Sequence, residues 1–297
     1  MAQVAAKEVQ PTVFGKRRRR SRRRYLGLSV PAVIGLVFIV CGVFATLLAP
    51  YDPNLIDITV RFLPPVFDGG VWDHPLGTDE LGRDTLSRLL HGAQVSLIVV
   101  AAVVPGAAVI GTLVGMISGW VGGPTGGILM RIVDVQLALP SILFAILLGS
   151  IFGPNLRNVI LILLVWTWAT YARLVRAEVL SIRERDFVTA SRAAGGGGWW
   201  IMRKHLFPNV LNTVVIIMTL EIAIVILAEA ALSFLGVGVP VETASWGKMI
   251  TDGRTYMNQA WWLIWLPGTA LLVVSLTGNL MGDWLRDALD PRLRNLA

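Results

Sequence analysis

The sequence lacks the charge that a water-soluble domain carries. Only 15% of its 297 residues are Asp, Glu, Lys or Arg, whereas soluble domains have about 25%. Hydrophobic residues make up 55% of the chain, and the mean hydropathy is +0.66. A single cysteine, Cys41, excludes an internal disulfide framework. These shortages exclude a soluble domain and a disulfide scaffold, and they indicate an integral membrane protein.

The sequence also lacks the motifs of catalysis and of nucleotide binding. Its three histidines, His74, His91 and His205, are far apart, and no H-E-x-x-H pattern occurs. There is no G-x-S-x-G pattern and no G-x-x-x-x-G-K-[ST] phosphate-binding loop. We therefore expect no catalytic residue, no metal site and no cofactor on this chain. If ATP powers its function, ATP and Mg must bind to another subunit.

Six apolar stretches predict an all-α membrane protein with six transmembrane helices, since a helix needs about 20 residues to cross a bilayer. The second and the fifth are the longest, Pro50 ends the first, and the fourth is short. Pro140 is expected to kink the third. The predicted spans are residues 26–49, 93–120, 128–151, 159–172, 211–235 and 261–284.

Positive charge is concentrated on one side of the predicted membrane. Nine of the 26 Lys and Arg precede Tyr25, and in all 20 fall in the proposed inner segments and 6 in the outer ones. This asymmetry places both termini in the cytoplasm, as a disordered basic segment 1–25 and a tail 285–297. The basic balance indicates orientation and contact with lipid head groups rather than nucleic-acid binding. A twin-arginine export signal fits residues 21–26 only loosely, and the apolar run that follows is too long for one.

Residues 50–92 form the largest predicted extracytoplasmic segment, ahead of a core domain at residues 93–284. Thr78 or Asp79 is expected to cap a short amphipathic helix. Its apolar side would hold Leu81, Leu86, Leu89 and Leu90. We interpret this helix as lying on the bilayer surface. The alternative is a surface that docks a substrate-delivering protein, with the candidate residues Asp79, Gly82, Arg83 and Asp84.

Small and charged residues within the spans suggest packing and pathway roles. Gly111, Gly115 and Gly119 recur every four residues, which predicts one helix face that packs closely against a neighbour. Arg131 and Asp134 are three apart and are expected to pair at the inner face. Acids inside a membrane usually face a protein interior or a wet cavity. Glu221, Glu229 and the kink at Pro140 are therefore candidates for the translocation pathway, with structural pairing as the alternative for Glu229.

Residues 186–209, DFVTASRAAGGGGWWIMRKHLFPN, form the longest polar-to-mixed segment in the second half of the chain. Four consecutive glycines begin at Gly195, and each costs roughly 1 kcal/mol in a helix relative to Ala. We predict two short helices that meet at a sharp bend, with Asp186 as the N-cap of the first and Gly195 at its end. The orientation places this loop, residues 173–210, in the cytoplasm, where a partner protein could grip it.

This segment resembles the cytoplasmic EAA motif of binding-protein-dependent ABC importer permeases, which reads E-A-A, three residues, G, nine residues, I-x-L-P. Ala190, Gly195 and Pro208 match the first Ala, the Gly and the final Pro. The motif's Glu, second Ala, Ile and Leu are replaced by Thr189, Ser191, His205 and Phe207. Residues 74–97, 130–140 and 229–246 are similar to the C-type subunits of dipeptide and oligopeptide permeases.

The resemblance implies the type I ABC importer transmembrane fold in a bacterial inner membrane. It implies a heterodimer with a second, B-type permease, two P-loop ATPase subunits or one fused ATPase, and an extracytoplasmic peptide-binding protein. It also implies that the loop fits a groove of the ATPase. The residues concerned are Asp186, Phe187, Thr189, Ala190, Ser191, Ala194, Gly195 and Pro208.

Other functions remain open at this point. The same family includes carriers of nickel, opines and other solutes, so the resemblance identifies the mechanism more firmly than the cargo. A secondary transporter would need paired interrupted helices and an ion-coupling cluster of acids, and the sequence shows neither clearly. A membrane-embedded enzyme would need clustered His, Asp or Ser near one membrane face.

Overall fold

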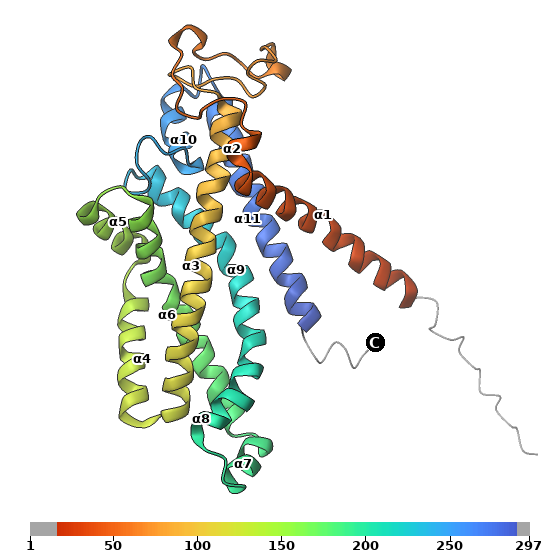
Figure 1. The fold of residues 1–297 in the computed structure, drawn as a ribbon, viewed down its shortest axis with the longest axis vertical. Coiled ribbons are helices and arrows are strands. Elements are labelled where there is room, and N and C mark those ends of the chain that lie inside the picture. The colour runs from red at the N-terminus through yellow and green to blue at the C-terminus, as the bar shows by residue number, and fades with distance from the viewer. Residues whose placement is uncertain (1–16, 290–297) are drawn as a thin grey trace, which may run out of the picture.

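The computed structural model describes residues 17–289, and places side chains for residues 30–288; within this part of the chain it is helical and has no strand. Long helices run beside one another, as Figure 1 shows. The loop before α3 and the short helix α10 (Trp246–Gly253) lie at one end of the bundle, and α7 and α8 lie at the other. We call these the outer and the inner end, after the orientation that the charge asymmetry predicts. The prediction of an all-α membrane protein is confirmed.

Three helices form the centre of the bundle: α3 (Thr85–Val121), α6 (Leu156–Arg183) and α9 (Phe207–Phe234). The glycine face of α3 packs directly on α6, as predicted. A Cβ added at Gly115 would lie 2.7 Å from the carbonyl oxygen of Ala172, so no larger residue fits without movement. Because glycine has no side chain, this face of α3 lets the backbones of α3 and α6 come close together.

The predicted spans agree with the structure in position more than in extent. Among the described residues, four helices are long and apolar enough to cross a membrane, or five if one bent pair counts as a span. They include α3, α6, the continuous helical stretch 198–234 that contains α9, and α11 (Trp262–Leu289). The count of six is not confirmed, because side chains of the first helix are placed only from residue 30, and the apolar stretch Val30–Val43 alone is shorter than a span.

The fourth span is longer than the sequence predicts. The expected residues 159–172 are helical, but α6 continues to Arg183. Its inner extension carries the charged residues that ended the apolar run, while Val175, Val179 and Ile182 are fully buried on its other face. Packing against α3 and α9 sustains this amphipathic extension, which a search for apolar residues alone misses.

The third span is broken rather than merely kinked. Helices α4 (Gly123–Ala138) and α5 (Ser141–Phe152) meet at an angle of 87°. Pro140 precedes α5, and Leu139 has the extended backbone, with ψ of 135°, that a following proline favours. The predicted position of the bend is confirmed, and the proline's effect on the preceding residue explains why the helix stops there.

The first helix, α1 (Arg17–Val43), diverges from the bundle and contacts α3 and α11 along only part of its length (Figure 1). The short helix α2 (Ala45–Leu48) follows it, and the helical run ends just before Pro50, as expected. Because α1 begins at Arg17, the expected disordered segment 1–25 is helical over residues 17–25. Residues 1–16 and 290–297, which hold the rest of that segment and most of the predicted tail, lie outside the described residues.

Candidate functional site

The glycine-containing loop folds into two short helices joined by a bend, as predicted. We call residues 184–208 the elbow; it contains α7 (Asp186–Ala193) and α8 (Gly198–Ile201). Gly195 has a φ of +82°, in the left-handed region that glycine adopts without strain. The amides of Gly195 and Gly196 donate to the carbonyls of Arg192 and Ser191, at 3.0 and 2.9 Å. This Schellman arrangement ends α7 and turns the chain.

The predicted N-cap of α7 is wrong by one residue. Arg185 has the extended backbone of a cap, and Asp186 is the first residue of the helix. There the carboxylate lies beside the unpaired N–H groups at the positive end of the helix dipole. Asp186 therefore favours the start of α7 through its charge rather than by capping it.

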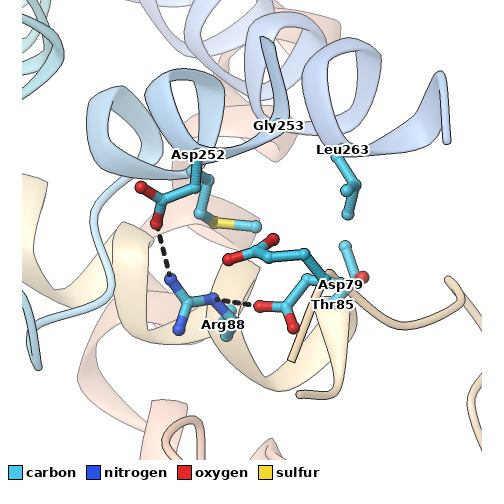
Figure 2. Close-up of a pocket in the computed structure, with 8 residues that line it drawn as sticks. Asp79, Thr85, Arg88, Asp252, Gly253 and Leu263 are labelled. Atoms are coloured by element: carbon cyan, nitrogen blue, oxygen red, sulfur yellow. Dashed lines mark ion pairs between the residues drawn. The ribbon is translucent and has the colours of Figure 1, made fainter. Parts of the chain in front are cut away.

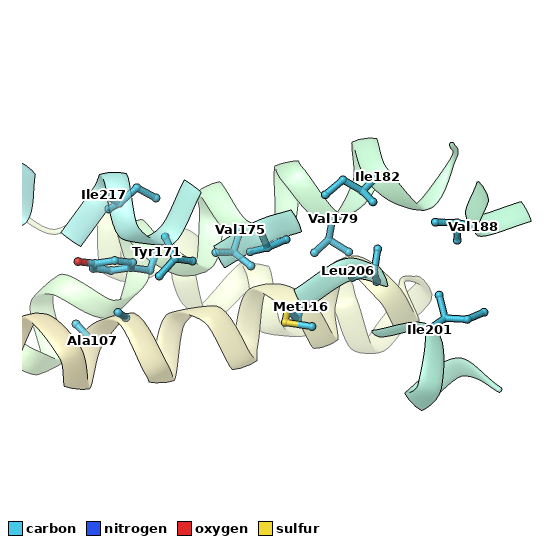
Figure 3. Close-up of a cluster of buried hydrophobic side chains, with 13 residues drawn as sticks. Ala107, Met116, Tyr171, Val175, Val179, Ile182, Val188, Ile201, Leu206 and Ile217 are labelled. Atoms are coloured by element: carbon cyan, nitrogen blue, oxygen red, sulfur yellow. The ribbon is translucent and has the colours of Figure 1, made fainter. Parts of the chain in front are cut away.

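One side chain fixes α7 to the bundle. Val188 is fully buried, and it joins a cluster to which α3, α6, α7, α8 and α9 all contribute. Figure 3 shows Val188 facing Ile182 of α6 and Ile201 of α8 at the inner end of this cluster. Most other residues of α7 are exposed. The exposed residues include the sequence candidates Asp186, Phe187, Thr189, Ala190, Ala194 and Gly195, while Ser191 is half-buried.

Ring contacts brace the elbow from two sides. The guanidinium of Arg192 lies 4.5 Å from the ring centroid of Trp120, at the inner end of α3. The ring of His205 lies 5.7 Å from that of Phe187 and 5.2 Å from that of Trp200. These contacts tie α7 to α3 and to the turn that precedes α9. The contact with Trp120 could not be predicted from spacing because Trp120 belongs to α3, whereas Phe187, Trp200 and His205 all lie within the elbow.

Pro208 lies, exposed, in the first turn of α9, just after a π-helical turn at Met202–Leu206. Proline has no N–H to donate, and its ring crowds the carbonyl four residues earlier. A wider turn relieves both problems without ending the helix. The side-chain amide of Asn209 donates to the carbonyl of His205 at 2.7 Å. The motif proline thus marks where the elbow joins the long helix.

The predicted pairing of Arg131 with Asp134 is wrong. The Asp134 carboxylate lies 2.6 Å from the guanidinium of Arg173, so the pair links α4 to α6. Both side chains are 54% exposed, and Arg131 is exposed as well. Tertiary packing places an arginine from another helix opposite Asp134, and spacing within one helix does not reveal it.

The two acids of α9 differ in their surroundings. Glu229 is fully buried and accepts hydrogen bonds from Ser233 at 2.8 Å and from Ser96 of α3 at 3.4 Å. These contacts favour the structural alternative for Glu229, since a residue enclosed by its own chain does not line a pathway. Glu221 is 7% exposed and lies one turn from Ile217 and from Val225, which belong to two different apolar clusters.

The expected amphipathic helix at the outer end is absent from residues 78–84, which form a folded loop instead. Asp84 is the N-cap of α3, and its carboxylate accepts from the amide of Ser87 at 2.8 Å. Asp79, Gly82, Arg83 and Asp84 are all buried, so they cannot form a docking surface as proposed. Gly82, with a φ of +73°, lets this loop fold back tightly onto Asp57.

The outer loop residues belong to a buried network of ion pairs. Arg83 lies 2.6 Å from Asp79 and 2.8 Å from Glu80. Arg88, which is 2% exposed, lies 3.5 Å from Asp79 and 3.8 Å from Asp252 of α10. Burial is the main cause that raises the pKa of Glu80 above its usual range. The network joins the loop to α3 and α10 at this end of the bundle.

Comparison with known proteins finds one matching family and several similar proteins. Residues 111–295 match the family described as "Binding-protein-dependent transport system inner membrane component". The "Di/tripeptide transport system permease protein DppC" of Pseudomonas aeruginosa is 43% identical over 263 residues, which cover 88% of this chain and 87% of that protein. The "Dipeptide transport system permease protein DppC" of Escherichia coli K12 is 44% identical over 268 residues, which cover 89% of each chain. The protein of that name in Haemophilus influenzae is 40% identical over 268 residues, 89% of this chain and 91% of its own.

Proposed function

Because this chain belongs to the family of binding-protein-dependent transport system inner membrane components, we propose that its elbow is the contact through which an ATPase drives it. The chain is a multi-pass bacterial inner-membrane protein with the type I ABC importer fold, and it is a permease component of a larger transport system. One observation carries the proposal. The elbow turns small exposed residues such as Ala190 outward while Val188 anchors it in the bundle.

The proposed cargo is a dipeptide or a short oligopeptide. The relatives named for di- and tripeptide transport cover close to nine-tenths of this chain at 40–44% identity. An importer of nickel, an opine or another solute with the same mechanism is the alternative. Cargo identity rests mainly on the soluble binding protein, so uptake of a labelled dipeptide and of Ni²⁺ by the same assembled importer would separate the two.

The proposed assembly has four kinds of component. A second, B-type permease pairs with this chain, and an extracytoplasmic binding protein delivers cargo to the outer end. Two P-loop ATPase subunits, or one fused ATPase, bind ATP and Mg and contact the elbow. This chain contributes the translocation path and carries no phosphate-binding motif of its own. Lipid covers the remaining apolar faces.

The proposed mechanism transmits movement through packing contacts. Val188 meets Ile182 and Ile201 in one cluster, which continues to Met116 and Val210. Close-packed side chains transmit displacement because an interior has little free volume. When ATP closes the ATPases, a movement of α7 therefore shifts the inner ends of α3, α6 and α9 together. The path between this chain and its paired permease then changes the side to which it opens.

The residues proposed for the path itself are Glu221 and the break at Pro140. Glu221 lies deep within α9, where a buried acid usually faces a protein interior or a wet cavity. The break at Pro140 turns α5 away from α4 by 87° and exposes its apolar side chains. Glu229 is not among the proposed path residues, because it accepts hydrogen bonds from two serines of its own chain.

A size series at Ala190 tests the coupling role. Replacing Ala190 with Trp should reduce ATP-driven dipeptide uptake by proteoliposomes to background, because a large ring keeps α7 out of a groove. The matched control, Ala190→Ser, keeps a small side chain and should retain uptake. Binding of the extracytoplasmic protein at the outer end should be unchanged in both. Uptake at the wild-type rate by the Trp variant would show that the elbow does not couple.

Orientation is tested with introduced cysteines after Cys41 is replaced by Ser. A membrane-impermeant maleimide should label Thr59→Cys from the outside of intact cells and Ala194→Cys only after permeabilisation. A cross-linker at Ala194→Cys should capture the P-loop ATPase. Labelling of the elbow from the outside would rule out the proposal.

A further inference from the structure

A small cavity of about 10 Å³ lies at the outer end, between the start of α3 and the corner where α10 leads to α11 (Figure 2). We propose that this cavity is a binding site for one water molecule, held by Thr85 and Glu80, which completes the ion network described above. The residues around it are Asp79, Glu80, Thr85, Arg88, Met249, Asp252, Gly253 and Leu263.

Two oxygen atoms around this cavity have no hydrogen-bond partner in the part of the chain that the structure describes. The hydroxyl of Thr85 and one carboxylate oxygen of Glu80 are buried, and neither finds a hydrogen-bond partner among the described residues. Thr85 is fully buried, and the other oxygen of Glu80 already accepts from Arg83 at 2.8 Å. Buried polar groups are nearly always hydrogen-bonded, and ordered water is the usual partner where the protein supplies none.

The charges around the cavity favour water over a cation. Three carboxylates, on Asp79, Glu80 and Asp252, face three basic groups, and N–O distances of 2.6–3.9 Å join them into one network. The basic groups are those of Arg83, Arg88 and Lys248. A bound cation would leave a positive charge uncompensated in a buried place. No group of three metal-binding side chains occurs in the part of the chain that the structure describes.

Size and hydrogen-bonding capacity also fit one water molecule. A buried water needs a space of roughly 10–15 Å³ and two to four polar partners. A water here donates to the free oxygen of Glu80 and accepts from the hydroxyl of Thr85, or donates to it. Its remaining capacity meets the carboxylate of Asp79 or Asp252, or the guanidinium of Arg88. The water would thereby link the loop, α3 and α10.

The site is tested first by a high-resolution map of the assembled importer in lipid. An ordered density within hydrogen-bond distance of Thr85 and Glu80 is the expected result. A map that resolves waters elsewhere in the chain but is empty here would overturn the proposal.

A pair of matched substitutions on α3 tests the same site by stability. Thr85→Val removes a partner of the water, so the thermal midpoint of the purified importer should fall. Thr112→Val removes another buried hydroxyl without a partner among the described residues, from a place outside this cavity. Its midpoint should stay or rise, because an apolar group of the same shape then replaces an unpaired one. A Thr85→Val midpoint at or above that of the wild type would overturn the proposal, and the map alone decides if this variant does not fold.

Discussion

The two ends of the bundle are built in opposite ways. At the inner end, the elbow exposes most of its small and polar residues and is fixed by three buried apolar side chains, Val188, Ile201 and Leu206. At the outer end, arginines and carboxylates are buried and paired within the chain, and α10 closes over them. The indole N–H of Trp246 in α10 donates to the carbonyl of Leu89 at 2.9 Å, which adds to this closure.

This difference fits the proposed contact between the elbow and an ATPase. If the elbow enters a groove of the ATPase as proposed, its small exposed residues leave room for the groove to close around it. At the outer end, the buried arginines and carboxylates find their charged partners within this chain. The outer charges, which looked like a docking surface in the sequence, hold three segments of this chain together.

The largest effect should come from the outer network. Replacing Arg88 with Met leaves Asp79 and Asp252 short of a partner, and breaking a buried pair costs about 3–5 kcal/mol. The control is Arg173→Met, which removes a pair that is 54% exposed on both sides and should cost about 0–1 kcal/mol. Unfolding midpoints of the two variants in the same detergent measure the contrast. Equal losses would mean that the outer end is not the more tightly closed one.

A smaller effect is expected at the bend of the elbow. Gly195→Ala places a side chain at a φ of +82°, which costs about 1–2 kcal/mol for an ordinary residue. Gly127→Ala in α4 adds a methyl group with no atom within 4 Å and should gain up to about 1 kcal/mol. Hydrogen exchange of the amides of α7 should speed up in the first variant only. Unchanged exchange would show that the bend does not depend on glycine.

The smallest effect concerns pH at the outer end. Burial raises the pKa of Glu80, so the folded chain keeps this proton where the unfolded chain has lost it. Glu80 therefore adds stability below its unfolded pKa of about 4.3, and this contribution is lost as pH rises through the raised folded value. Glu80→Gln should flatten that decline in thermal midpoint.

Asp57 provides the control of opposite sign. Hydrogen bonds from the hydroxyl and the amide of Thr59 lower the pKa of Asp57. Its contribution is present above its unfolded pKa, about 3.9, and is lost as pH falls through the lowered folded value. Asp57→Asn should therefore change only the acid limb. An unchanged pH profile in Glu80→Gln would show that burial does not perturb this carboxyl.

Much of the inner end could be predicted from the sequence because its signals are local. Consecutive glycines disfavour a helix through their backbone entropy, and Gly195 has the left-handed backbone expected at a helix end. Pro140 likewise bends the chain where it was expected to. What could not be predicted was which residue of α7 would be buried, because Val188 finds its partners on α6, α8 and α9.

At the outer end the prediction of a surface helix was wrong, again because burial depends on partners from distant segments. The pattern of leucines before the second span predicts a surface helix, but α3 begins only at Thr85. Asp79 and Arg83 pair with each other and reach α10 through Asp252 and Arg88. A residue more than a hundred positions away thus decides whether these charges are exposed or buried.

The sequence by itself determined that the chain is a helical membrane protein, where its longest apolar runs lie, and where glycine and proline interrupt them. These properties depend on composition and on backbone preferences, which act within a few residues. Only the tertiary structure decided how far α6 extends, that Asp134 pairs with Arg173, and that the outer charges are enclosed. Burial and pairing depend on which distant segments pack together, and the bundle brings those segments into contact.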